Sequence, residues 1–446
     1  MTDFILGTTV RNILSLLLVV LVASISPAAE PWSQYGGPTG DFRLPAVAAT
    51  TTTEKEWKRD LPAGRCGVVC DGTRLFTMYA RPVEGKKTTV DEYVVAMKAT
   101  TGETLWEEAN RVTLLGKQEA FGGAQVQPQA TPVVSDGQVL SVGITGLVSA
   151  RDAATGKLAW ACDLVKDFKA TPVQYGFTAS PISAGGNIIV PVGGQHAAIA
   201  LAPATGKLVW ASAAAEPAYG TPVLVRVDKA ECVVLQTRDA LLGLSLTSGE
   251  TLWTLPTPKR GLTNVPTPLV LPKGKLVVSG QGWNGTNLVQ LGFDGKTWTV
   301  KEVWQQTKAQ YFYTNWTIQG SVVIGFTGNS SKRLTALRLK DGSVVSQDQG
   351  HTDCNVLALG DELLVLRGDG LLSIGKVEGD TFEAGRKAQP LPGRCWVAPT
   401  VLGSSVVLRT STQLASVNLS TLKADFTAPK DAGVSALEEA FGTKSK

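Results

Sequence analysis

Histidine is nearly absent from this chain, which has only His196 and His351 among its 446 residues. Most zinc and haem sites need histidine, and these two residues are not spaced as a pair of ligands. A histidine-based metal centre or a Ser-His-Asp triad is therefore not expected. Charge is also scarce, because charged residues make up 18% of the chain and the net charge is +4. This balance gives no reason to expect a nucleic-acid or membrane-surface partner.

A hydrophobic run near the N-terminus has the pattern of an export signal. Arg11 precedes the apolar residues 13–25, which are followed by Ser-Pro-Ala-Ala at 26–29. A basic residue, a short apolar core and small residues are typical of a cleaved signal peptide. An uncleaved anchor is the alternative, although a membrane span needs about 20 apolar residues. No cysteine follows for a lipid anchor, so we expect a signal peptide at 1–29 and an exported periplasmic or extracellular protein without a stable membrane span.

An internal repeat dominates the rest of the chain. Four segments carry a Gly followed four residues later by a Trp, and the Gly-to-Gly steps are 54, 50 and 43 residues. The pairs are Gly102 and Trp106, Gly156 and Trp160, Gly206 and Trp210, and Gly249 and Trp253. Weaker copies at 293–296, 340–343, 378–381 and 420–423 extend the series to eight units.

Each unit contains the pattern of four short strands. A small residue and a Pro precede the first strand, as in Thr131-Pro132, and further apolar runs lead to the Gly turn and the Trp strand. Four strands at this period are typical of a β-propeller blade. The Gly suits a tight turn with positive φ, and the Trp suits packing between neighbouring blades. The pattern predicts an all-β, eight-bladed propeller over residues 56–427, with seven blades as the alternative because the last units are degenerate.

The two ends of this region predict how the ring closes. Residues 56–61 read as a fourth strand with no blade before it, and the eighth unit lacks a good fourth strand of its own. We therefore expect 56–61 to complete the last blade, which removes exposed sheet edges. Residues 30–55 would form an N-terminal extension, and residues 428–446 a flexible C-terminal tail.

The segment Gly156-Lys157-Leu158-Ala159-Trp160 and its siblings resemble the pyrroloquinoline-quinone (PQQ) propeller repeat. This resemblance covers residues 56–427 and includes the secreted bacterial branch of the superfamily, whose members often begin like residues 31–38. The repeat occurs in eight-bladed quinoprotein alcohol dehydrogenases and in the non-enzymatic BamB-type propellers of outer-membrane protein assembly. The fold is thus an expectation of the resemblance, whereas the function depends on which of these branches the site residues match.

The resemblance to the dehydrogenases implies features that this chain lacks. Those enzymes hold the quinone beneath two adjacent cysteines and near a calcium ion. The six cysteines here are all separate in sequence, no segment matches the calcium site, and no Cys-x-x-Cys-His haem segment is present. The sequence favours a monomeric, non-catalytic scaffold of the cell envelope that binds a protein or peptide and needs no cofactor or metal. A PQQ- and calcium-dependent alcohol or aldose oxidoreductase with an atypical site is the alternative.

Aligning the blades predicts a ring of residues at one mouth of the central channel, because first strands line the channel of a propeller. The ring includes Cys66, Asn264, Asn315, Cys354 and Cys395, with Arg65, Asp353 and Arg394 directly before three of them. Tyr313, Trp316 and Trp283 lie near the matching end of other blades, where they could stack on a ligand or simply pack.

The tripeptide Gly-Arg-Cys occurs twice, at 64–66 and 393–395, in blades that should be neighbours. The cysteines there could pack as small side chains, form a Cys66–Cys395 disulfide, or bind a metal together with Cys354. Arg65 and Arg394 could bind a carboxylate or phosphate, or pair internally with Asp353. The sequence leaves these alternatives open.

Overall fold

The computed structural model describes residues 31–45, 55–116, 118, 127–259, 264–328, 333–349, 353–378 and 381–427, without the side chains of Phe312, Gln349 and Cys354. The predicted signal peptide at 1–29 and tail at 428–446 lie outside the described residues. No helix within the described ranges is long and apolar enough to cross a membrane.

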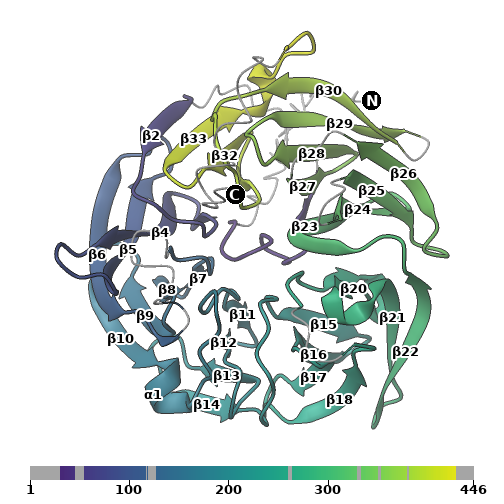
Figure 1. The fold of residues 1–446 in the computed structure, drawn as a ribbon, viewed down its shortest axis with the longest axis horizontal. Helices are drawn as coiled ribbons and strands as arrows, with labels where there is room; N and C mark the ends of the chain where they lie inside the picture. The colour runs from purple at the N-terminus through teal and green to yellow at the C-terminus, as the bar shows by residue number, and fades with distance from the viewer. Residues whose placement is uncertain are drawn as a thin grey trace, which may run out of the picture. The chain divides into compact units, whose positions relative to one another are not determined.

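Eight antiparallel four-stranded blades are arranged in a ring (Figure 1), and one of their sheets gains a fifth, parallel strand, β1 (Arg43–Leu44). This confirms the eight-bladed propeller and makes the seven-bladed alternative wrong. The first four blades are, in chain order, β3–β6 (Val69–Cys70, Arg74–Pro82, Thr89–Lys98, Thr104–Thr113), β7–β10 (Val133–Ser135, Gln138–Val142, Leu147–Asp152, Leu158–Asp163), β11–β14 (Ile182–Ala184, Asn187–Pro191, Ala198–Leu201, Leu208–Ala211) and β15–β18 (Val223–Val227, Ala230–Gln236, Ala240–Ser245, Thr251–Pro256).

The remaining blades continue the same order. They are β19–β22 (Leu269–Leu271, Lys275–Gly280, Gly285–Phe293, Trp298–Gln306), β23–β26 (Tyr311–Gln319, Val322–Thr327, Arg333–Arg338, Val344–Gln349), β27–β30 (Cys354–Leu359, Glu362–Arg367, Leu372–Glu378, Thr381–Ala388) and β31–β33 (Thr400–Leu402, Ser405–Arg409, Gln413–Asn418) with β2 (Trp57–Asp60). Helical turns are short: α1 (Leu164–Phe168) and the 3₁₀ turns Pro272–Gly274, Gln281–Trp283 and Leu419–Thr421.

The last blade is completed from the N-terminal side of the chain, as the sequence predicts. Strand β2 pairs antiparallel with β33, and Trp57 lies opposite Ser416. The first and last blades are therefore joined by a strand that comes from outside the repeat. This closure covers the edge of β33, which would otherwise be open to another chain.

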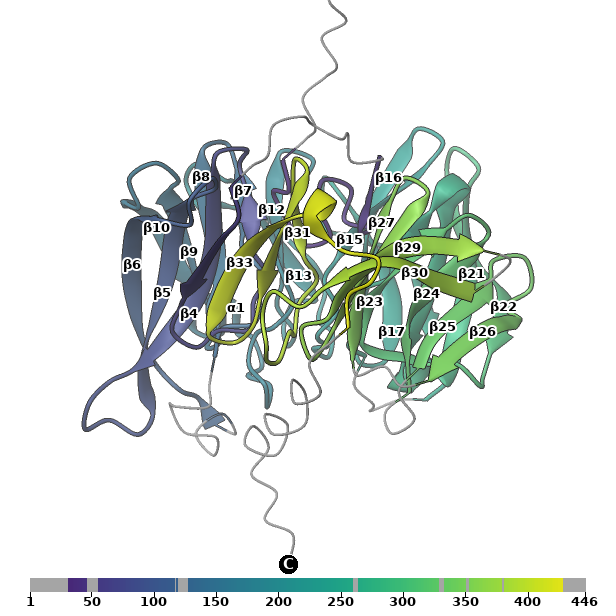
Figure 2. The same ribbon diagram turned by 90° about the horizontal axis from the view of Figure 1, so that it is seen from above.

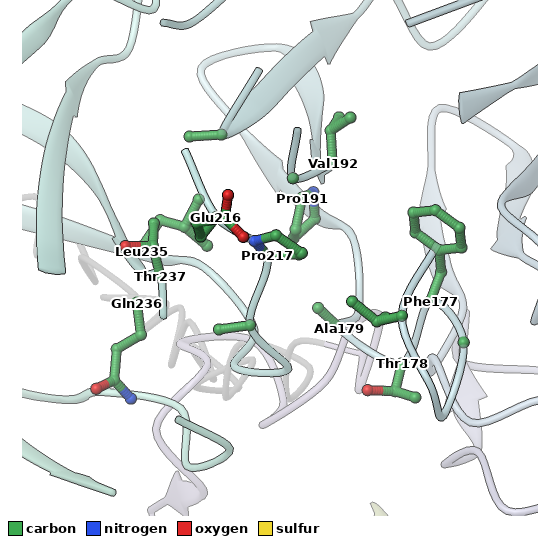
Figure 3. Close-up of a pocket in the computed structure, with 15 residues that line it drawn as sticks. Phe177, Thr178, Ala179, Pro191, Val192, Glu216, Pro217, Leu235, Gln236 and Thr237 are labelled. Atoms are coloured by element: carbon green, nitrogen blue, oxygen red, sulfur yellow. The ribbon is translucent and has the colours of Figure 1, made fainter. Parts of the chain in front are cut away.

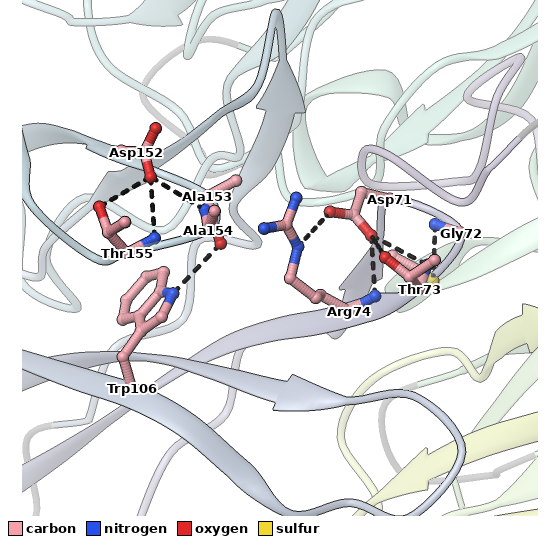
Figure 4. A network of polar contacts seen from close by, with 10 residues as sticks. Asp71, Gly72, Thr73, Arg74, Trp106, Asp152, Ala153, Ala154 and Thr155 are labelled. Carbon is pink, nitrogen blue, oxygen red and sulfur yellow. Dashed lines mark hydrogen bonds and ion pairs between the residues drawn. The ribbon is translucent and has the colours of Figure 1, made fainter.

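The repeat Trp fastens each of five blades to the next one. The indole N–H donates to a backbone carbonyl in the following blade's turn at 2.7–3.1 Å, and the ring lies against the turn Gly. Figure 4 shows Trp106 donating to Ala153 beside the turn that Asp152 stabilises. The five pairs are Trp57 with Gly102, Trp106 with Gly156, Trp160 with Gly206, Trp210 with Gly249, and Trp304 with Gly342.

These turn glycines meet two demands at once. Their φ angles lie between 68° and 76°, where a side chain is strained, and a Cβ would also collide with the neighbouring indole. Trp253 packs differently, in a cluster with Leu276, Trp283 and Val289 of the following blade. The repeat Trp residues thus pack between neighbouring blades.

Residues 31–45 enter the channel and contact one blade after another. Cys70 and Val134 donate backbone hydrogen bonds to the carbonyls of Trp32 and Ser33, each at 2.8 Å, and Ser183 donates to the Gln34 side chain at 3.1 Å. These bonds reach the first three blades. The purple segment in the centre of Figure 1 is this part of the chain.

The same segment continues to the far side of the ring. The Thr317 hydroxyl donates to the Phe42 carbonyl at 3.2 Å, and strand β1 (Arg43–Leu44) runs parallel to β27 beside Ala358 and Leu359. Trp32 and Phe42 are buried in the core shared by the first and last two blades. We call residues 31–45 the channel segment; the sequence indicated an extension here but not that it contacts the first strands of several blades.

Candidate binding site at the channel mouth

The two mouths of the channel are not equivalent. Strand β1 pairs with the C-terminal end of β27, so the channel segment lies toward the mouth where first strands end. The opposite mouth, where first strands begin, carries the predicted site residues and is called the open mouth here. In Figure 2 the β4–β5 hairpin and α1 project on the lower side, and the purple channel segment lies toward the upper side.

Arg65 and Arg394 meet at the open mouth, where both side chains lie over the ring of Trp396. The sequence analysis did not select Trp396 as a site residue. The guanidinium carbons lie 5.0 Å and 4.1 Å from the ring centroid of Trp396, which places two cations on one indole. Arg394 also forms an ion pair with Asp353. One of the two predicted alternatives, internal pairing with Asp353, is thus realised for Arg394.

Arg65 differs from Arg394 in having no ion pair with any carboxylate in the described residues. Burial lowers the pKa of its guanidinium, and burial together with the charge of Arg65 lowers the pKa of Arg394. The positive charges of Arg65 and Arg394 repel each other, and within the described residues the one carboxylate paired with them is that of Asp353. The cluster formed by Arg65, Asp353, Arg394 and Trp396 therefore has an excess positive charge that an anionic group would relieve.

The cysteines beside these arginines do not form a bridge in the structure. Cys66 and Cys395 are free thiols, buried in two different apolar clusters. The sulfur of Cys66 lies 3.3 Å from the hydroxyl of Thr77 and accepts from Arg409 of the last blade at 3.1 Å. The disulfide alternative is not realised because the Cys66 thiol faces these partners between the blades. No group of three or more metal-binding side chains occurs among the described residues, and the Cys354 side chain is not among them.

Asn264 and Asn315 brace loops and strands instead of facing a ligand. The buried Asn264 amide donates to Thr237 O at 2.9 Å and accepts from Gly282 N at 3.1 Å. The Asn315 amide accepts from Val356 N at 3.0 Å and donates to Val356 O at 2.5 Å. The expectation that these positions ring an open channel is corrected here, because both amides point between adjacent blades.

Trp316 and Trp283 are also part of the packing. Trp316 is buried, stacks edge-on against Tyr311 at 4.6 Å, and donates to Thr267 O at 2.8 Å. The buried Trp283 indole donates to the side chain of Gln236 at 2.5 Å. Neither ring is available to stack on a ligand. Of the two alternatives, stacking and packing, the structure shows packing for both Trp residues.

Tyr313 is the exception among the predicted aromatics, because 58% of it is exposed. Burial of its phenol and the nearby Tyr175 raise its pKa, which places the two rings in one neighbourhood. Tyr175 is 53% exposed and lies 6.0 Å from the ring of Tyr219. The sequence analysis did not select Tyr175 or Tyr219.

A small cavity lies among the loops of the third and fourth blades at the open mouth (Figure 3). Phe177, Val192, Pro217 and Gln236 are among the residues that line it, and it holds about 20 Å³. That space fits about one water molecule, whereas small-molecule sites span about 300–1,000 Å³. This cavity is too small for a tricyclic quinone.

The profile of the family described as "Outer membrane protein assembly factor BamB" matches residues 90–348, more than half of the chain. BamB from Moraxella catarrhalis is 15% identical, with a TM-score of 0.54, and the match covers 83% of this chain and 99% of that one. No curated protein matches the chain.

Quinohemoprotein alcohol dehydrogenases share the fold as well. The enzyme from Comamonas testosteroni is 11% identical, with a TM-score of 0.58, over 90% of this chain and 81% of that one. ADHIIG from Pseudomonas putida HK5 is 13% identical, with a TM-score of 0.58, over 90% and 82%. At these identities the likeness shows the eight-bladed fold and does not separate the two functions.

Proposed function

This chain belongs to the propeller family described as outer membrane protein assembly factor BamB, and from that premise we propose that it is a non-catalytic binding scaffold of the cell envelope. Its partner would be a protein or peptide, bound at the open mouth. The family match and the export pattern at 1–29 support a place in the periplasm or at the inner face of the outer membrane. No cofactor is needed for this role.

The observation that carries the proposal is the set of side chains at the open mouth. Arg65 lies over Trp396 without an ion pair in the described residues, and Tyr175 and Tyr313 are large aromatic side chains that are more than half exposed. Arg, Trp and Tyr are enriched at protein interfaces, where a few of them contribute most of the binding energy.

The channel segment gives a second reason to expect an extended binding surface and not a small-molecule pocket. Because residues 31–45 lie across the mouth where the first strands end, a partner has access at the open mouth, where it meets loops and the cation–indole cluster. An extended surface of this kind suits a folded protein or a peptide better than a small substrate.

A crosslinking experiment tests the proposal in the native envelope. A photo-reactive benzoylphenylalanine replaces Tyr313, and in a matched control it replaces Val303, which is 48% exposed on the outer strand β22. We expect a discrete protein adduct from position 313 that disappears in the Trp396→Ala variant and does not form from position 303. Identical adducts from both positions would contradict a site at the open mouth.

A second assay addresses the oxidoreductase alternative directly. The purified protein is incubated with PQQ and calcium, and dye reduction is followed with alcohols and aldoses. We expect no turnover above the rate of a heat-unfolded sample. Turnover that saturates with substrate would overturn the scaffold proposal in favour of a quinoprotein.

A further inference from the structure

A groove of about 540 Å³ lies at the rim of the propeller, where the seventh and eighth blades meet. Its walls come from β2, from the end of β30 and from residues 421–426, which follow the last repeat. Lys387 of β30 and Lys423 exchange backbone hydrogen bonds at 2.8 Å and 3.0 Å, so the wall formed by residues 421–426 is held in place. The groove is thus built from ordered backbone on two sides.

The seventh blade, beside the groove, lacks the repeat Trp. Arg386 of β30 occupies the position of the repeat Trp. It pairs with Ile374 next to a register shift, and Trp160 pairs with Ala150 next to the equivalent shift in the second blade. The Arg386 guanidinium donates to Leu419 O at 2.9 Å, in place of an indole N–H, and also pairs with Glu362 at 3.0 Å. Arg386 thus makes the contact between these two blades that an indole makes elsewhere in the ring.

Three lysines, Lys58, Lys387 and Lys423, line this groove. None of them forms an ion pair with a carboxylate in the described part of the chain, whereas nearby Lys376 pairs with Asp361. The one acidic side chain in the lining, Glu56, is engaged by Asn418 N at 3.0 Å and by the Thr421 hydroxyl at 2.6 Å. The groove therefore attracts negative charge.

The strand β2 presents an open edge at the same place. Leu61 N donates to Thr412 O at 2.8 Å, and the hydrogen-bonded positions of an antiparallel pair alternate. The backbone N–H and C=O of Lys58 therefore point away from β33, and β33 is the one strand that β2 pairs with in the described residues. An unpaired edge is the surface to which an extended peptide adds as a further strand.

We propose that this groove, called the β2 groove, receives an extended acidic segment of a partner protein. The segment adds a strand to the outer edge of β2 and places its carboxylates against Lys58, Lys387 and Lys423. This inference rests on the proposed function, since it gives the scaffold a partner of stated chemistry, but it uses a surface separate from the open mouth.

The test uses the purified protein and a labelled ten-residue peptide of alternating Thr and Glu, followed by fluorescence anisotropy at low salt. The charge-reversed variant Lys58→Glu/Lys387→Glu/Lys423→Glu should bind at least about tenfold more weakly than the native protein. The matched control Lys157→Glu/Lys207→Glu/Lys296→Glu changes net charge equally, at exposed turns elsewhere, and should bind like the native protein.

A second peptide, of alternating Pro and Glu, separates strand addition from simple charge attraction. It carries the same charge but lacks half of the backbone donors, so it should bind at least about tenfold more weakly. Trp396→Ala at the open mouth should leave binding of the Thr-Glu peptide unchanged, so the two proposals can fail independently.

Three results would overturn the β2 groove as a docking site. The first is no binding of the Thr-Glu peptide by the native protein, and the second is equal weakening by both triple variants. The third is equal affinity for the two peptides, which would rule out an added strand.

Discussion

The contact between a turn glycine and the neighbouring indole predicts how much a single methyl group should destabilise the ring. Gly206 has a φ of 68°, and a Cβ built on it would lie 2.5 Å from the ring of Trp160. Gly206→Ala therefore adds two costs: a left-handed backbone for an L-residue and a clash with an aromatic ring. Gly137 isolates the first cost, because its φ is 73° and nothing lies within 4 Å of its Cβ position.

The magnitudes follow from these two environments. A left-handed conformation costs an L-residue about 1–2 kcal/mol, which both alanine variants share. Overpacking at Gly206 adds about 1–3 kcal/mol, because Trp160 is held by its hydrogen bond to Pro203 O at 2.7 Å and by the blade behind it. We expect Gly206→Ala to lower the free energy of unfolding by about 2–5 kcal/mol and Gly137→Ala by about 1–2 kcal/mol.

Urea unfolding followed by far-UV circular dichroism measures both variants, with the slope compared to check that the transition is unchanged. A double-mutant cycle with Trp160→Ala completes the test. With the indole removed, the cost of Gly206→Ala should fall to that of Gly137→Ala. Equal losses for the two glycine variants, or no coupling to Trp160, would refute the argument that the indole requires glycine in this turn.

Three further predictions follow from buried groups and from the closure. Burial raises the pKa of Glu92 to about 7, so the folded state favours its protonated form; the resulting stability is complete below about pH 4.5 and is lost as the pH rises through 7. Relative to Glu92→Gln, the native protein should lose up to about 3 kcal/mol between pH 5 and pH 8 in urea unfolding, and parallel pH profiles would contradict this. Asn315→Ala leaves both backbone groups of Val356 unpaired and should cost about 2–4 kcal/mol without any ligand present; an unchanged urea midpoint would argue against bracing. A chain beginning at Ala63 lacks β2 and the channel segment and should show no cooperative unfolding transition by circular dichroism, whereas a stable product would contradict closure by β2.

The blades were predictable because each repeat contains the residues that determine its own turn and its own packing contact. A Gly with positive φ and a Trp four residues later mark the same turn and the same contact in successive units, so the pattern could be read without knowing any long-range contact. The closing strand was predictable for a related reason, since residues 56–61 carry the pattern of a fourth strand without the rest of a blade.

The site was less predictable because alignment gives a position along a strand but not the direction of its side chain. Asn264 and Asn315 align with the arginine loops, yet their amides bond to backbone groups of neighbouring blades. Trp396 was missed although it directly follows Arg394 and Cys395, because it has no counterpart in the repeat. Residues outside the repeat can be placed only when the contacts between distant blades are known.

The channel segment shows why this matters for function. Residues 31–45 lie outside the repeat, yet their hydrogen bonds to Cys70, Val134 and Ser183 cross the channel from blade to blade. The segment lies across the mouth where the first strands end and so covers one of the two faces of the ring. At the other mouth, Tyr175 and Tyr313 are more than half exposed. Under the proposed function, the part of the sequence without the repeat pattern thus leaves one face of the propeller for the partner.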